Sequence, residues 1–168
     1  MARGDIRIVD HGGHNVVPTI RWQVASGAAT TILAGEPTKQ GNTANPYAAI
    51  CATADLTIGT DQPFTGVAAI ASTDTAAADG LVDLYLPLAG VVYQQKVVTA
   101  SLADTDAEVN ALVGDALVWS LASSNWRLDT AAGAGANNAL VVIGGDAVDN
   151  SLKFIVRHDG TFIGRAQV

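Results

Sequence analysis

Three histidines are the residues of this chain whose type and spacing could support metal binding or acid–base catalysis. His11 and His14 have the spacing H-x-x-H, which lets two imidazoles chelate one metal ion when a helix places them on the same face. Two glycines lie between them and disfavour a helix, and no cysteine pair or acidic cluster supplies the remaining ligands at a familiar spacing. The pattern is therefore more typical of a solvated loop than of a metal site.

The other chemically active groups are better explained by structure than by catalysis. Cys51, the one cysteine, lies in the apolar stretch 49–52, which predicts a buried thiol. The paired glycines near residues 133–135 and 144–145 do not match the phosphate-binding pattern G-x-x-x-x-G-K-[ST] and do not open a predicted helix, so they predict turns. The sequence thus predicts a protein that is not an enzyme and that needs no cofactor or metal ion.

The acidic residues indicate an all-β protein. Asp outnumbers Glu by 14 to 2 and there are only 3 Lys, so the residues that usually cover exposed helices are scarce. Asp favours turns, whereas the abundant Val, Ile and Thr favour strands. Several aspartates punctuate predicted loops without the D-x-D-x-D-G spacing of a calcium loop, namely Asp55, Asp61, Asp74 and Asp79.

The charge distribution excludes several classes of partner. The net charge is -7, with +1 in residues 1–24, +2 in residues 151–168 and -10 between them. A sequence pI near 4.6 is opposite to the basic surface that nucleic-acid binding needs. No apolar run approaches the roughly 18 residues of a membrane helix, and the N-terminus lacks the apolar region of a signal peptide. We therefore expect a protein made in a reducing cytoplasm, with neither a nucleic-acid nor a membrane partner.

The hydrophobic pattern predicts many short strands and one helix, an arrangement typical of a small barrel or sandwich. A capping box, Thr105 with Glu108, predicts a short helix over about 105–113 that Gly114 ends. Trp119 and Trp126 are expected to be cross-strand partners in a hairpin. The stretch 35–46 is predicted to be a long loop that is either exposed or functional. Strands are predicted over residues 20–24, 30–34, 47–52, 66–71, 82–88, 91–98, 116–121, 125–128, 140–143, 152–157 and 161–168.

Residues 1–19 have no sustained hydrophobic period and contain the loop-like stretch HGGHN. We predict that they form an extended N-terminal arm that leaves the body of the protein, and that residues 20–168 form a single β-rich domain.

A longer segment carries a resemblance to a known family. Residues 54–98 read ADLTIGTDQPFTGVAAIASTDTAAADGLVDLYLPLAGVVYQQKV, with looser continuations TDAEVNALVGDALV at 105–118 and NALVVIGGD at 138–146. This pattern, a strand with G-V-A, a Gly-ended loop and a strand with V-D-L-Y-x-P, resembles the capsid decoration (cement, head-stabilising) proteins of tailed bacteriophages. Together the segments cover roughly half of the chain.

The resemblance implies a structural virion protein on the exterior of the capsid, where it would bridge subunits of the major capsid protein and associate with itself as a homotrimer. The arm has no counterpart in the family pattern, so its role is inferred from this chain alone: residues 1–20 would become ordered on the shell. The candidate capsid-binding residues are Arg3, Ile6, Arg7, Ile8, His11, His14, Val16 and Val17.

Two alternatives stay open at this point. A phage tail or fibre domain has a similar Gly-, Ala- and Thr-rich β composition, although fibre shafts usually show repeats and none is seen here. A β-sandwich hydrolase or lyase would use His11, His14 or His158 with one of the aspartates.

Overall fold

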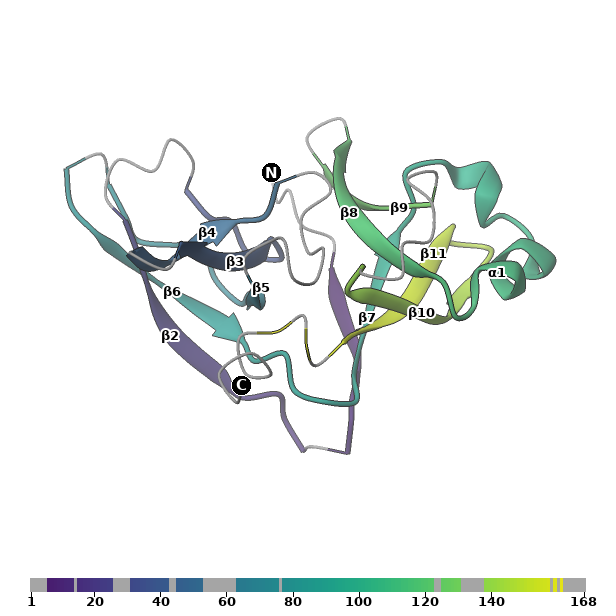
Figure 1. Cartoon of the computed structure of the whole chain (residues 1–168), viewed down its shortest axis with the longest axis horizontal. Helices are drawn as coiled ribbons and strands as arrows, with labels where there is room; N and C mark the ends of the chain where they lie inside the picture. Colours follow the sequence, from purple (N-terminus) through teal and green to yellow (C-terminus); the bar gives the residue numbers. More distant parts are fainter. Residues whose placement is uncertain are drawn as a thin grey trace.

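The chain folds into two antiparallel β-sheets and one α-helix, which confirms the all-β class (Figure 1). The computed structural model describes residues 6–13, 15–25, 31–42, 45–52, 63–75, 77–122, 125–130, 138–157, 159 and 161. Neither sheet closes into a barrel within these residues. No helix among them is long and apolar enough to cross a membrane.

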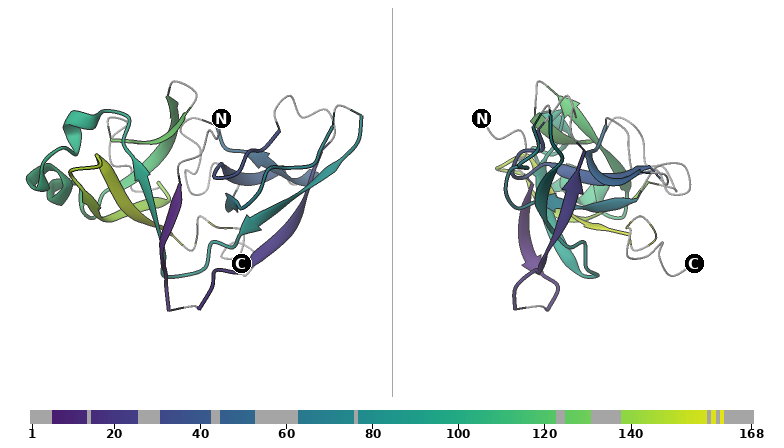
Figure 2. Two further views of the ribbon diagram at one scale, coloured as in Figure 1. Left: turned by 180° about the vertical axis from the view of Figure 1, so that it is seen from behind. Right: turned by 90° about the vertical axis from the view of Figure 1, so that its left-hand side faces the viewer.

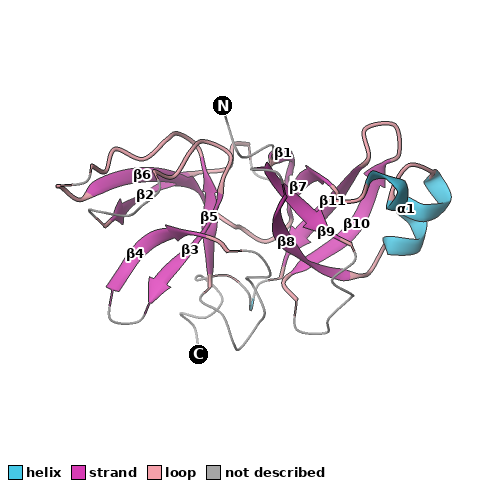
Figure 3. Ribbon diagram, turned by 90° about the horizontal axis from the view of Figure 1, so that it is seen from above, coloured by secondary structure: helices cyan, strands magenta, loops and turns pink. Residues whose placement is uncertain are grey.

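The six-stranded sheet occupies one half of the molecule, with helix α1 at its far end (Figures 1 and 3). Its strand order is β1-β7-β11-β10-β8-β9. The elements of this half are β1 (Arg7–His11), β7 (Val91–Lys96), the 3-10 helix η1 (Ala100–Leu102), α1 (Asp106–Leu112), β8 (Ala116–Ala122), β9 (Asn125–Asp129), β10 (Leu140–Asp146) and β11 (Ser151–Val156).

The five-stranded sheet forms the other half, and the view from behind shows the same division (Figure 2). Its order is β2-β6-β5-β3-β4. The strands are β2 (Thr19–Val24), β3 (Pro37–Asn42), β4 (Asn45–Ile50), β5 (Phe64–Ala68) and β6 (Gly80–Tyr85). One face buries Val24, Val82 and Leu84 in a small core of its own.

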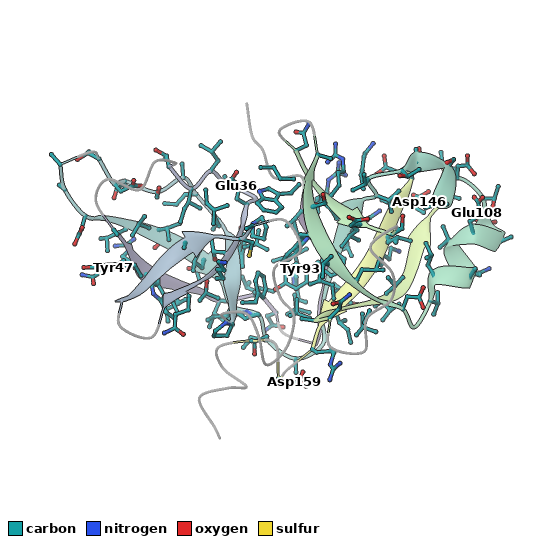
Figure 4. The ribbon with its side chains drawn as sticks, turned by 45° about the horizontal axis from the view of Figure 1, so that its top comes forward. Glu36, Tyr47, Tyr93, Glu108, Asp146 and Asp159 are labelled. Carbon is teal, nitrogen blue, oxygen red and sulfur yellow. The ribbon has the colours of Figure 1, made fainter. Side chains whose placement is uncertain are left out.

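Aromatic side chains join the two sheets. Phe64 on β5 lies 5.3 Å from Trp119 and 6.4 Å from Tyr93, measured between ring centroids, and both partners belong to the six-stranded sheet. Phe154 stacks on Tyr93 at 5.7 Å and meets Trp119 edge-on at 5.9 Å. Figure 4 places Tyr93 in the middle of the molecule. All four side chains are almost fully buried. Each aromatic pair adds about 0.5–1.5 kcal/mol beyond the burial of its area, so this cluster is a main link between the halves.

The segment that resembles decoration proteins supplies strands of both sheets, namely β5 and β6 of the five-stranded sheet and β7 of the six-stranded sheet. Its G-V-A is Gly66–Ala68 on β5, and its V-D-L-Y is Val82–Tyr85 on the adjacent strand β6. Gly66 has φ +149°, and a Cβ there would lie 2.3 Å from the carbonyl oxygen of Tyr85. Only glycine therefore lets β5 approach β6 this closely.

The helix prediction is confirmed in detail. Thr105 is the N-cap of α1, where its hydroxyl accepts a hydrogen bond from the Glu108 N–H and the Glu108 carboxylate accepts one from the Thr105 N–H. Gly114 follows the helix with φ +94°, a conformation that glycine adopts without strain.

The prediction of an arm that leaves the body is wrong for the described part of residues 1–19. Arg7–His11 is strand β1, which pairs antiparallel with β7. Ile6 and Val17 are buried in the main core at 8% and 3% exposure. The segment lacks a regular period because a bulge interrupts β1 between Ile8 and Asp10 and a turn follows it. Residues 1–5 and His14 lie outside the described residues.

The long loop predicted over 35–46 is also wrong, because it contains β3 and the start of β4. Pro37 is the first residue of β3, a position where a missing N–H is tolerated. Thr38 is fully buried, and its hydroxyl donates to the Gly66 carbonyl at 2.8 Å and shares a hydrogen bond with the Thr65 hydroxyl. Paired hydroxyls thus allow the polar residue Thr38 to be buried in this strand.

Two other local predictions need correction, and a third falls almost entirely outside the described residues. Residues 31–34 form no strand, because the Ile32 N–H donates to the side-chain hydroxyl of Ser72 in a loop and the Ile32 carbonyl accepts from the Ser72 N–H. Trp119 pairs with Leu128, and Trp126 with Leu121, so the two tryptophans are not directly opposite. In the strand predicted over 161–168, Thr161 forms a parallel bridge with Phe64, and the rest lies outside the described residues.

Replacing Gly66 with alanine tests the close approach of β5 to its neighbour β6. We expect Gly66→Ala to lower the free energy of unfolding by roughly 2–5 kcal/mol, the sum of overpacking and backbone strain. Gly13→Ala is the matched control, because Gly13 also has positive φ but a Cβ there would meet no atom within 4 Å. Urea unfolding gives the free energy of unfolding of both variants. Equal losses of stability in the two would contradict a steric need for glycine at position 66.

Candidate interface at the edge strand β1

Strand β1 lies at the edge of the six-stranded sheet. It pairs with β7 on one side, with Ile8 opposite Tyr93 and His11 opposite Val91, and no strand of the described residues pairs with its other side. An edge strand presents backbone donors and acceptors that a strand of another chain can join. The bulge after Ile8 limits this open edge to a short length.

A groove of about 400 Å³ lies beside β1, between it and the five-stranded sheet. One wall comes from β1 and the segment that follows it, and the other comes from β5, β6 and the turn before β3. Its lining residues are mostly apolar: Ile6, Ile8, His11, Val16, Val17, Gly35, Val67, Ala68, Ala69 and Tyr85. The groove can therefore accept apolar side chains next to an open strand edge.

Five of the eight predicted capsid-binding residues line this groove: Ile6, Ile8, His11, Val16 and Val17. They have different roles, however. Ile6 and Val17 are core residues, whereas His11 is exposed and Val16 is 71% exposed at the rim. Arg3 and His14 lie outside the described residues. Val16 and His11 are thus the predicted residues best placed to touch a partner.

Arg7 does not line the groove and instead lies with Lys96 and Asp149 beside a cavity of about 10 Å³. The Lys96 amine is 2.9 Å from the Asp149 carboxylate. The pKa of Asp149 is lowered chiefly by the hydrogen bond from Lys96 and further by the positive charges of Lys96 and Arg7. All of these groups are near the surface, so we infer a modest contribution to stability.

Gly12 and Gly13 form a turn directly after β1. The Asp10 carboxylate accepts a hydrogen bond of 2.9 Å from the Gly12 N–H, and Gly12 and Gly13 have φ of +61° and +83°. A Cβ on Gly12 would lie 2.5 Å from the backbone of Gly90, so this turn packs against the turn that precedes β7. In the described part of the chain, no group of three or more His, Cys, Asp or Glu side chains could hold a metal ion.

Sequence reasoning missed the second wall of the groove. The predicted core strand is confirmed for Val67 and Ala68, which are buried on β5, but the strand ends at Ala68 and Ile70 is 51% exposed. The apolar run continues past the end of β5, and apolar residues beyond a strand are the signal that could have indicated a surface site. Tyr85 could have been found from the alternation of β6, because it follows the buried Leu84 and faces the opposite side.

Comparison with protein-family models, curated proteins and solved structures finds no match to this chain. A proposal about its function therefore depends on its own sequence and geometry.

The pKa of Asp149 tests the electrostatic arrangement behind β1. Lys96→Met should raise this pKa toward its ordinary value, because the variant removes the main hydrogen-bond donor and one positive charge. Since folding lowers the pKa, the ion pair stabilises the protein above the unfolded-state pKa, and this contribution disappears as the pH falls through the folded-state pKa. Titration of the Asp149 carboxyl by NMR measures the shift. Lys39→Met, on the other sheet, is the control, and an unchanged pKa in Lys96→Met would contradict the assignment.

Proposed function

We propose that this chain is a structural protein that binds the outer surface of a tailed-bacteriophage capsid and stabilises the shell by bridging subunits of the major capsid protein. The observation that carries the proposal is the open edge of β1 beside an apolar groove. This pair of features suits an extended protein segment, whose backbone would join the edge while its apolar side chains enter the groove.

The segment that resembles decoration proteins supports the same assignment from a different direction. It supplies β5 and β6, and Val67, Ala68 and Tyr85 from these strands form part of the groove wall. It also supplies β7, which holds β1 in place through the other side of that strand. The part of the chain that suggests the family therefore builds the candidate interface.

A protein that stabilises a capsid shell needs to bury surface area between subunits and needs no catalytic chemistry. A specific protein interface of standard size buries about 1,600 Å² in total, and repeating it at many equivalent positions would stiffen a shell. The groove and the short open edge would form the centre of such an interface, and the exposed apolar side chains Val16 and Ile70 near it would extend the contact. Self-association as a homotrimer, which the resemblance implies, would link three such contacts in one unit.

Binding to shells can be tested with a charge placed at the rim of the groove. Purified protein is mixed with undecorated capsids of a tailed phage whose genome encodes this chain, and co-sedimentation gives the saturable binding curve. We expect Val16→Asp to weaken binding at least tenfold, because a carboxylate would have to lose water in an apolar contact. Val113→Asp is the matched control, since Val113 is also an exposed valine, at 48%, but follows α1 at the far end of the molecule.

The outcomes separate the function from the site. Failure of the unaltered protein to bind any shell would overturn the proposed function. Strong binding by both variants would leave a shell-binding protein but would contradict the groove as its interface. Sedimentation velocity of the free protein reports whether trimers form before binding.

A further inference from the structure

We propose that the open edge of β1 selects an extended segment in which an acidic residue stands between two apolar residues. The segment would belong to the capsid protein, so this specificity rests on the proposed function and deepens it. Two features of β1 support it: the direction of its free backbone groups and the charges beside it.

The backbone of Ile8 faces the open edge. The Val97 N–H donates to the Asn150 carbonyl and continues the register of β7 with β11, so the odd-numbered residues of β7 direct their backbone groups toward β11. The even-numbered residues of β7 therefore face β1. Ile8 lies opposite the odd-numbered Tyr93, and its N–H and carbonyl hence point away from β7. A strand added at this edge would exchange backbone hydrogen bonds with Ile8.

The two faces of an added strand would meet different surroundings. Every strand pair of this sheet is antiparallel, so we expect an antiparallel segment. Its residues opposite Ile8 and Ile6, two positions apart, would direct their side chains to the groove that both isoleucines line. The residue between them would lie on the other face of the sheet, beside Arg7.

The groove face suits apolar side chains. Its far wall includes Gly35, Ala68 and Ala69, whose small size leaves open the volume of about 400 Å³. In the described part of the chain, no Asp, Glu, Lys or Arg lines this groove. A charged side chain placed there would lose water without gaining an ionic partner. Both positions of the segment that face the groove should therefore be apolar.

The outer face beside β1 carries a net positive charge. Arg7 is exposed and lies opposite Gln94, which in turn lies opposite Lys153 of β11. Lys96, on the same face of β7, forms its ion pair with Asp149, so these two charges cancel. Arg7 and Lys153 thus supply the positive charge beside the middle position of the segment. Because opposite charges stabilise a cross-strand pair, that position should be Asp or Glu.

The other end of β1 has the opposite preference. Asp10 follows the bulge and lies opposite Val92, which places it on the same outer face as Arg7. An acidic residue beside Asp10 would meet a like charge. The acidic position is therefore specific to the Arg7 end of the edge.

Short peptides test this specificity on the intact chain. The first, acetyl-Ser-Val-Glu-Val-Ser-amide, has the inferred pattern, and the second has Lys in place of Glu. The third, acetyl-Val-Ser-Glu-Ser-Val-amide, has the same composition as the first but places Val and Glu on one face. NMR titration that follows the Ile8 amide gives the three dissociation constants. We expect the first peptide to bind roughly threefold or more tightly than either of the others.

Substitution of Arg7 tests the source of the charge preference. Arg7→Gln should remove most of the difference between the Glu and Lys peptides, and Arg7→Glu should reverse their order. Lys39→Gln, the matched change of charge on the other sheet, should leave the order unchanged.

The outcomes are separable from those of capsid binding. Absence of peptide binding, equal affinity for all three peptides, or a preference that Arg7→Glu does not reverse would overturn the specificity and leave the proposed function intact. The expected peptide series from a chain that does not co-sediment with capsids would support the specificity and overturn the proposed function.

Discussion

The contact of Phe64 with Trp119 and Tyr93 is the interaction on which the rest of this structure depends. The main core lies mostly in the six-stranded half, and the five-stranded half enters it through Phe64, Val67 and Cys51. Phe64 begins β5, and Gly66 two residues later lets that strand pair closely with β6. A few residues of β5 thus fix both the link between the sheets and the position of the groove wall.

The candidate interface follows from this junction. Two sheets that meet at one cluster leave a groove beside it, and the N-terminal segment fills part of that space with Ile6 and Val17. Strand β1 is therefore a component of the fold as well as of the proposed binding surface. Removing residues 1–20 would delete core side chains together with contact residues, so single exposed substitutions separate the two roles better than truncation does.

Much of the fold could be predicted from the sequence, and the exceptions have physical causes. Strands with a clear alternation, such as β2, and the helix with its capping box follow from local patterns. Strand β3 was missed because its polar residues are satisfied by partners such as Thr65, which are distant in sequence. Strand β1 was missed because a bulge and a glycine turn disrupt its period. Local sequence indicated several groove residues but could not reveal the second wall, which tertiary packing brings to β1.

The most direct test of the account is a cryo-EM reconstruction of phage capsids decorated with this protein. The account predicts that a segment of the capsid protein lies along the open edge of β1 and covers the groove with its apolar side chains. A reconstruction in which the protein contacts the shell through α1, with β1 and the groove facing solvent, would contradict it.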